Sequence, residues 1–342
     1  MTLEALLADP IERRQLVAAT AADLRSGDPP DMLVSAGTEA LVLTSMLAGE
    51  LGLPMAYLRP RPKTHGRQQR VEGELRGRVI LIAASSGAEG IRDYTELVAE
   101  NGAHVSRVVP LPPRREGNYA EGVPAVHAPT LSRKPERNNV ASDEGIARIL
   151  LDIGAVVIRG EPFRYASGLL SPIYTDCRLL ISHPPEWQAV LDSLSSKLLD
   201  ATFDAVDGVA TSGIPHASVL AYRLDKPLVY VDDGAIAGAP ATGSQLVVVE
   251  DLVTTGKSVI EATGALRAAG LRVDRCFAIF AYDRHQPGLK TAGIAFEPLS
   301  ELATLLDLGV TAGYFGAAER DAVLNWRRDP RDWTARHEPG SL

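Results

Sequence analysis

The amino-acid sequence predicts an α/β protein in which helices flank largely parallel sheets. Short runs of β-branched apolar residues, such as residues 79–82 and 246–249, alternate with longer apolar helical stretches. This alternation is typical of βαβ units, whose parallel strands are buried on both faces. A stretch rich in proline and polar residues, 111–142, interrupts it. The sequence therefore predicts two α/β regions joined by a linker.

Length and composition agree with two such regions. The chain has 342 residues, of which 45% are hydrophobic and 23% charged, enough for two domains of about 150 residues each. We expect a first domain over residues 1–111, a linker over 112–141 and a second domain over 142–342.

Charge and cysteine content exclude several classes of partner. The net charge of −8 gives no footprint for nucleic acid or an anionic membrane. No apolar run approaches the ~18 residues of a membrane span, and the first residues lack the basic and apolar parts of an export signal. Cys177 and Cys276 lie far apart without metal spacing. We therefore expect a cytoplasmic protein with neither a nucleic-acid nor a membrane partner.

The two regions resemble each other. Residues 31–59 align without a gap with residues 204–232, which pairs Thr38 with Thr211 and Ser45 with Ser218. The alternative is that any two βαβ stretches look alike. Because the matched segments follow in the same order with similar spacings, an internal duplication is the simpler interpretation.

The second region contains a motif suited to a phosphorylated sugar. A buried strand runs into the acids Glu250 and Asp251 and then into a short loop that opens a helix, formed by Thr254, Thr255, Gly256, Lys257 and Ser258. Free N–H groups at a helix start, together with hydroxyl donors, bind phosphate. Two neighbouring carboxylates accept hydrogen bonds from ribose hydroxyls and favour positive charge on the sugar ring. The spacing fits neither a Walker A loop nor a dinucleotide fingerprint.

The string 248–258 resembles the motif with which type I phosphoribosyltransferases bind phosphoribosyl pyrophosphate (PRPP). Residues 163–178, 208–215 and 282–284 are similar to orotate phosphoribosyltransferases, so that the resemblance covers roughly residues 143–335. It implies the type I phosphoribosyltransferase fold, with a small hood in the second copy. It also implies transfer of ribosyl phosphate from PRPP to orotate, with magnesium carried on the pyrophosphate and with Asp251 as a candidate contact of the metal.

The resemblance also assigns substrate residues. PRPP would be bound by the motif and by Thr211, Ser212 and Gly213. Orotate would lie among Ser167, Gly168, Tyr174 and Thr254, and Arg284 would meet its carboxylate, because a guanidinium fork fits a planar anion. The alternatives are an ordinary ion pair of Arg284 with Asp283 and a core role for Tyr174. Many relatives have lysine where this chain has Ala166, which leaves the identity of the base open.

A basic loop that the resemblance leads us to expect in the second region occurs instead in the first. Family members cover the reacting centre with a basic loop, but residues 232–240 are acidic and rich in glycine and alanine. After the strand 55–58 of the first region come Arg59, Lys63 and His65, similar to that catalytic loop, with Pro60 in place of a lysine. Residues 83–87 of the first region, in turn, replace the ribose-binding acids with alanine, serine and glycine.

In the family this loop acts across a dimer interface. We therefore expect the first region to complete the site of the second, as a pseudo-dimer within one chain, with Arg59, Lys63, His65 and Asp251 as catalytic residues. The alternatives are a homodimer that exchanges loops, a solvated basic loop without a role, a PRPP or nucleotide sensor that does not catalyse, and a transferase for another base.

Overall fold

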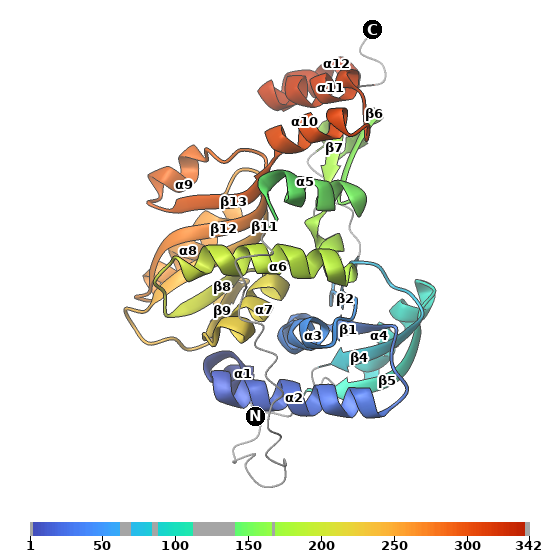
Figure 1. Cartoon of the computed structure of the whole chain (residues 1–342), viewed down its shortest axis with the longest axis vertical. Coiled ribbons are helices and arrows are strands. Elements are labelled where there is room, and N and C mark those ends of the chain that lie inside the picture. The colour runs from blue at the N-terminus through green and yellow to red at the C-terminus, as the bar shows by residue number, and fades with distance from the viewer. Residues whose placement is uncertain (1–2, 62–69, 84–87, 112–140, 166–167, 339–342) are drawn as a thin grey trace.

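The computed structural model describes residues 3–61, 70–83, 88–111, 141–165 and 168–338. These residues form two large sheets, a two-stranded sheet and the helices packed on them (Figure 1). Among them, no helix has the length and apolar character needed to cross a membrane. Both cysteines are buried and free.

The first large sheet has the strand order β3-β2-β1-β4-β5. Its strands are β1 (Met32–Ala36), β2 (Met55–Leu58), β3 (Val71–Glu72), β4 (Arg78–Ala83) and β5 (His104–Pro110). Helix α3 (Thr38–Leu51) connects β1 with β2, and α4 (Ala88–Glu100) connects β4 with β5. Four strands are parallel, and β3 runs antiparallel to β2.

The second large sheet repeats this order and adds one strand, as β10-β9-β8-β11-β12-β13. Its strands are β8 (Ala205–Val209), β9 (Leu228–Asp232), β10 (Ala235–Ala237), β11 (Gln245–Val253), β12 (Arg272–Ala281) and β13 (Ala295–Glu301). Helices α6 (Pro184–Leu199), α7 (Ile214–Leu224), α8 (Lys257–Ala268) and α9 (Pro287–Thr291) accompany it. The edge strand β10 is antiparallel, so the predicted parallel arrangement holds except at one edge of each sheet.

The two regions pack through equivalent helices. Helix α3 lies against α7 (Figure 1), and the sequence alignment places these helices at the same position of their units. A Cβ added to Gly49 would lie 3.2 Å from Cγ1 of Val219, so the helices meet closely at this glycine. Nine consecutive residues of α3 are buried because the helix lies between its own sheet and α7.

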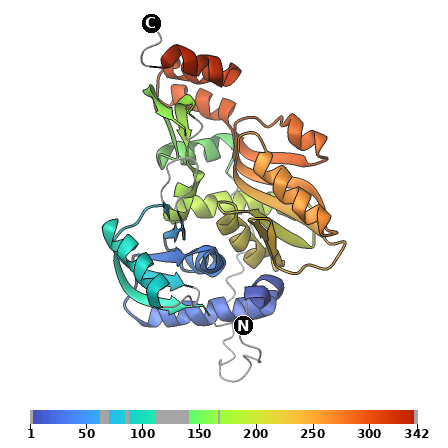
Figure 2. The ribbon, with the colours of Figure 1, turned by 180° about the vertical axis from the view of Figure 1, so that it is seen from behind.

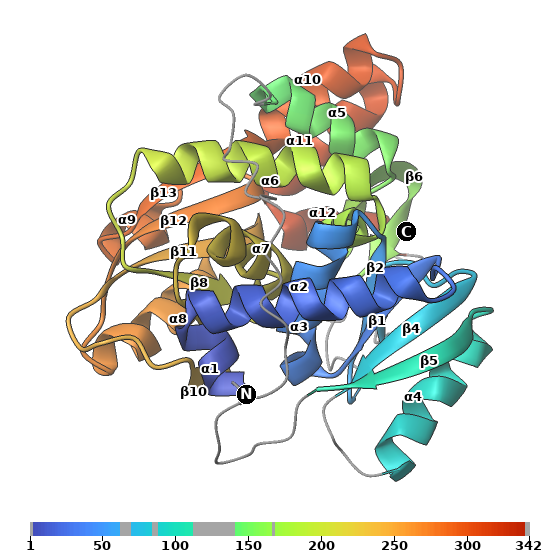
Figure 3. The same ribbon diagram turned by 60° about the horizontal axis from the view of Figure 1, so that its bottom comes forward.

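A buried arginine fastens the N-terminal helices to the second region. Helix α2 (Pro10–Ser26), which follows α1 (Leu3–Ala8), runs beside both α3 and α7 (Figure 3). Arg13 is fully buried, and its guanidinium donates to the carbonyl oxygens of Ala221 (3.0 Å) and Lys226 (2.6 Å) at the end of α7. Burial lowers the pKa of Arg13 to about 10, so it remains charged at neutral pH. A cation there is stabilised by the negative end of the helix dipole.

The predicted hood is a small antiparallel sheet of β6 (Val156–Arg164) and β7 (Leu170–Thr175), followed by the 3-10 helix η2 (Cys177–Ser182). Helices α11 (Ala317–Arg328) and α12 (Pro330–His337) pack against it (Figure 2). The indole of Trp326 donates to the carbonyl oxygen of Leu170 at 2.9 Å. Helices α5 (Asp143–Asp152) and α10 (Leu302–Thr311) connect the hood to β13.

Candidate active site

The predicted phosphate motif has the expected form of strand, loop and helix. Strand β11 carries Glu250 and Asp251, which are 6% and 7% exposed, and α8 begins at Lys257. Gly256 has a φ of 76°, and a Cβ there would lie 2.9 Å from the Leu289 side chain. Glycine is therefore required at this turn. The residues on either side of it are exposed and open to a ligand: Thr254, Thr255, Lys257 and Ser258.

The acids of β11 are buried beside a third acid. Burial raises the pKa of Glu250 well above its ordinary value, and the charge of Asp251 raises it further. Asp207 on the adjacent strand β8 adds to this effect. Asp207 is itself fully buried, and burial raises its pKa to about 8. A group of acids like this favours a ligand that donates hydrogen bonds or develops positive charge.

The turn after β8 lies directly beside β11. It contains Thr211, Ser212 and Gly213 and leads into α7. A Cβ on Gly213 would lie 2.5 Å from the carbonyl oxygen of Val249, so only glycine permits this approach. The structure thus brings the two predicted PRPP-binding segments together at one edge of the sheet.

Arg59 reaches this edge from the first region. It follows β2, and its Nη2 donates a hydrogen bond to Oγ1 of Thr211. Burial raises the pKa of both Tyr57 and Tyr230 to about 12, and Asp232 contributes to the rise at each. The ends of β2 and β9 therefore lie near each other. Lys63 and His65, the other predicted residues of the basic loop, lie outside the described residues.

A tight hairpin stands where the second region lacks that loop. Asp232 pairs with Ala235, and the two residues between them, Asp233 and Gly234, have φ values of 47° and 79°. An Asp-Gly pair with positive φ at both positions forms the type I′ turn that closes two-residue hairpins. The acidic segment is thus a short structural turn.

The structure describes some, but not all, of the residues predicted to bind orotate. Ser167 and Ala166 lie outside the described residues. Gly168 is exposed beside the start of β7, with a φ of 85°. Tyr174 is half-buried on β7, with its ring centroid 5.5 Å from that of Phe163.

Arg284 is held by two carboxylates. Its Nε donates to Oε1 of Glu301 and its Nη2 to Oδ2 of Asp143, each at 2.7 Å. Asp283 instead accepts from Arg327 at 3.2 Å, so the alternative of an Arg284–Asp283 ion pair is wrong. The two bonds leave the Nη1 edge of Arg284 unused by these carboxylates.

Comparison with known proteins decides the family. No family model matches the chain. The chain is 41% identical over 202 residues to an orotate phosphoribosyltransferase of Coxiella burnetii (strain RSA 493 / Nine Mile phase I), covering 55% of this chain and 96% of that protein. It is 37% identical over 200 residues to one of Bacillus cereus (strain G9842), with 55% and 95% covered. The chain belongs to the orotate phosphoribosyltransferase family.

Solved structures of similar proteins include family members. An orotate phosphoribosyltransferase from Aeropyrum pernix has 34% sequence identity and a TM-score of 0.43, covering 47% of this chain and 97% of that one. A UMP synthase from Leishmania donovani has 21% identity and a TM-score of 0.49, covering 92% of this chain and 64% of that one.

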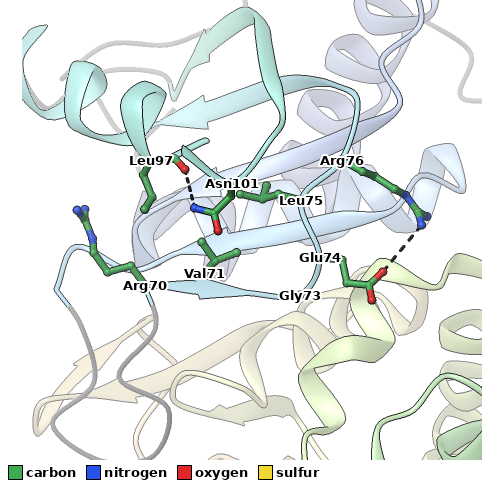
Figure 4. A pocket seen from close by; sticks show the side chains of 8 residues that line it. All are labelled: Arg70, Val71, Gly73, Glu74, Leu75, Arg76, Leu97 and Asn101. Carbon is green, nitrogen blue, oxygen red and sulfur yellow. Dashed lines mark hydrogen bonds and ion pairs between the residues drawn. The ribbon is translucent and has the colours of Figure 1, made fainter. Parts of the chain in front are cut away.

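A surface hollow of about 490 Å³ lies away from the predicted site, between β3 and α4 (Figure 4). Its two arginines have partners, because Arg70 pairs with Asp93 and Arg76 lies 3.9 Å from Glu74. None of the predicted site residues that the structure describes lines it.

Two residues at the site were not predicted. Glu72 on β3 is buried and accepts a hydrogen bond from Nε of Arg59 at 2.6 Å. It also accepts one from Nη1 of Arg178 on η2, at 3.1 Å. The sequence places Glu72 shortly after the basic loop, but nothing in it signals a contact with a residue 106 positions away. This contact connects the first region of the chain with the second.

Proposed function

We propose that this protein is an orotate phosphoribosyltransferase, which converts orotate and PRPP to orotidine 5′-monophosphate and pyrophosphate. The observation that carries the proposal is the buried pair Glu250 and Asp251, which opens onto the exposed loop at the start of α8 and lies beside the turn 211–213. Family membership agrees with this arrangement.

In this proposal the 5′-phosphate binds to the loop from Thr254 to Ser258, where the N–H groups of α8 begin. The ribose hydroxyls donate to Glu250 and Asp251. As the bond to pyrophosphate breaks, positive charge grows on the sugar ring, and the carboxyl oxygens of this pair stabilise it. Thr211, Ser212 and Gly213 line the pyrophosphate side.

Magnesium would arrive on the pyrophosphate of PRPP. Carboxylate oxygens are the ligands that this cation prefers, and Asp251 supplies one at the edge of the sheet. Bound magnesium would neutralise charge on the leaving group.

Orotate is assigned to the hood side of the same edge. Gly168 and Tyr174 would form its wall together with Ser167, and Thr254 would touch the base. The Nη1 edge of Arg284 would meet the orotate carboxylate, while Glu301 and Asp143 hold the rest of the guanidinium. A guanidinium fixed in this way loses little freedom when it binds an anion.

The first region is proposed to supply the cations. Arg59, Lys63 and His65 would act on pyrophosphate as it departs. The contact of Arg59 with Thr211 and the packing of α3 on α7 support a pseudo-dimer within one chain, built from a duplicated unit with domains at 1–111 and 142–342 and a linker at 112–141. A tethered partner has an effective concentration near the millimolar range.

The test is a turnover assay with PRPP, magnesium and a panel of purine and pyrimidine bases, in which pyrophosphate is measured. We expect pyrophosphate release that requires orotate. Release with a different base alone would change the assigned substrate. PRPP binding without release for any base would indicate a sensor instead.

A further inference from the structure

Glu72 connects the first region of the molecule with the second. Its side chain is 4% exposed and lies between two arginines, Arg59 from the first region and Arg178 from η2 of the second. Both guanidinium groups donate to the same oxygen, Oε1. A buried carboxylate shared by two arginines from different regions of the chain is fixed in position.

Arg59 is held on two sides. Its Nε and Nη2 contact Glu72, and Nη2 also donates to Thr211 at the pyrophosphate side of the proposed site. The backbone N–H of Arg59 donates to the carbonyl oxygen of Arg70 at 2.7 Å, next to the pairing of β2 with β3. Glu72 therefore fixes the orientation of Arg59, one of the predicted catalytic cations.

Arg178 connects the same carboxylate to the hood. Its Nη2 donates to Oδ2 of Asp176 at 2.7 Å and lies 3.5 Å from the hydroxyl of Tyr174. Burial opposes ionisation, but hydrogen bonding and charge from Asp176, together with the charge of Glu72, raise the pKa of Arg178. Among the described residues, these contacts join two guanidinium groups to two carboxylates.

We propose that Glu72 is a positioning residue for phosphoribosyl transfer: it holds Arg59 against Thr211 for contact with departing pyrophosphate, and it ties that cation through Arg178 to the hood. This inference rests on the proposed function. Glu72 acts through Arg59, so its loss should matter only while Arg59 is present.

A double-mutant cycle tests this dependence with the full chain. Glu72→Gln, Arg59→Ala and the double variant are compared with the parent, by kcat and by KM for orotate and PRPP. We expect Glu72→Gln to lower kcat by about 10- to 100-fold, the scale of a misplaced catalytic group, with the KM for orotate within about threefold. In the Arg59→Ala background the same substitution should change kcat by less than about twofold.

The matched control is Glu74→Gln, two residues along the chain, where the carboxylate is 47% exposed and 3.9 Å from Arg76. It should keep the parental kcat. An equal loss from Glu72→Gln in both backgrounds would show a structural role and overturn the proposal, as would a parental kcat in Glu72→Gln. If Glu72→Gln does not fold, the cycle is run with Glu72→Asp, which keeps the charge but shortens the side chain.

A binding measurement separates this inference from the proposed function. Calorimetric titration with inorganic pyrophosphate and magnesium needs no turnover. If the parent releases no pyrophosphate with any base, the proposed function fails, but an effect of Glu72→Gln on pyrophosphate affinity of threefold or more that disappears in Arg59→Ala still supports the positioning role. No effect, or the same effect in both backgrounds, overturns it.

Discussion

The two large sheets share a strand order but differ at their functional ends. In the first, β4 ends at Ala83 and β2 is followed by Arg59, whereas in the second, β11 carries Glu250 and Asp251 and β9 turns back at once into β10. The same strand order therefore occurs twice, while the acids and the cations of the proposed site are divided between the two regions. The comparison shows that the fold determines where side chains lie, whereas the chemistry depends on which residues occupy those positions.

The largest expected effect comes from the acids that only the second sheet carries. Asp251→Asn should lower kcat by about 10³-fold, because an uncharged amide no longer stabilises positive charge on the ribose. Steady-state assays measure this change. Glu261→Gln, at an exposed position of α8, is the control and should keep parental activity. A kcat within threefold of the parent in Asp251→Asn would remove the assigned role of the pair.

The next effect concerns the cations that only the first region carries. Lys63→Ala should lower kcat by roughly 10²- to 10³-fold, the scale of losing one preorganised charge, with an unchanged midpoint of urea unfolding. Lys197→Ala, on α6 at a side chain 48% exposed, should remain fully active. Activity of Lys63→Ala within twofold of the parent would show that the first region does not complete the site.

Mixing two inactive variants asks whether the division of roles is kept within one chain. Lys63→Ala and Asp251→Ala are unfolded and refolded together. Exchange between chains would make half of the random dimers mixed, each with one working site in two, so that about a quarter of parental activity would return. We expect no recovery, because α3 and α7 of one chain already pack together.

A smaller effect is expected at the base. Arg284→Ala should raise the KM for orotate by about tenfold, the scale of a hydrogen bond to a charged group, and leave the KM for PRPP within about threefold. Arg327→Ala, which removes the partner of Asp283, is the matched control. Equal losses for both substrates in Arg284→Ala would place this arginine outside the base pocket.

Local sequence patterns predicted the parts that neighbouring residues determine. The strand before Glu250 and the helix after Gly256 have the expected form, because runs of apolar residues and turn residues specify them locally. The hood was expected from the family resemblance alone. The sequence alignment also identified α3 and α7 as equivalent helices. Their packing against each other was not predicted, and neither were the contacts of Arg13 with α7 or of Glu72 with Arg178. These contacts join residues far apart in the chain, which local patterns do not encode.

A comparison of the central strands gives an effect on stability instead of activity. In the alignment of the two regions, Val34 of β1 corresponds to Asp207 of β8, and both residues are fully buried. The folded protein keeps the Asp207 proton up to about pH 8, whereas the ordinary pKa is 3.8. Because the folded pKa is raised, stability from this group is full below pH 3.8 and falls as pH rises toward 8.

Asp207→Asn should remove this dependence. Relative to the parent, the variant should become more stable between pH 5 and pH 8, by at most about 1.4 kcal/mol per pH unit. Urea unfolding at several pH values measures the change. Asp307→Asn, at an exposed position of α10, should follow the parental curve. A constant difference between Asp207→Asn and the parent would show that Asp207 does not carry a raised pKa.

A continuous apolar core has a consequence for how the molecule melts. Buried side chains from both regions, including Leu33 and Leu47 of the first and Trp187 and Leu220 of the second, belong to one cluster. Unfolding either region would expose the apolar face of α3 or α7 to water, at a cost of about 25 cal/mol for each Å² uncovered. Neither region is therefore expected to stay folded while the other region is unfolded. Heating should therefore give a single cooperative heat-absorption peak in calorimetry, although the chain contains two complete large sheets.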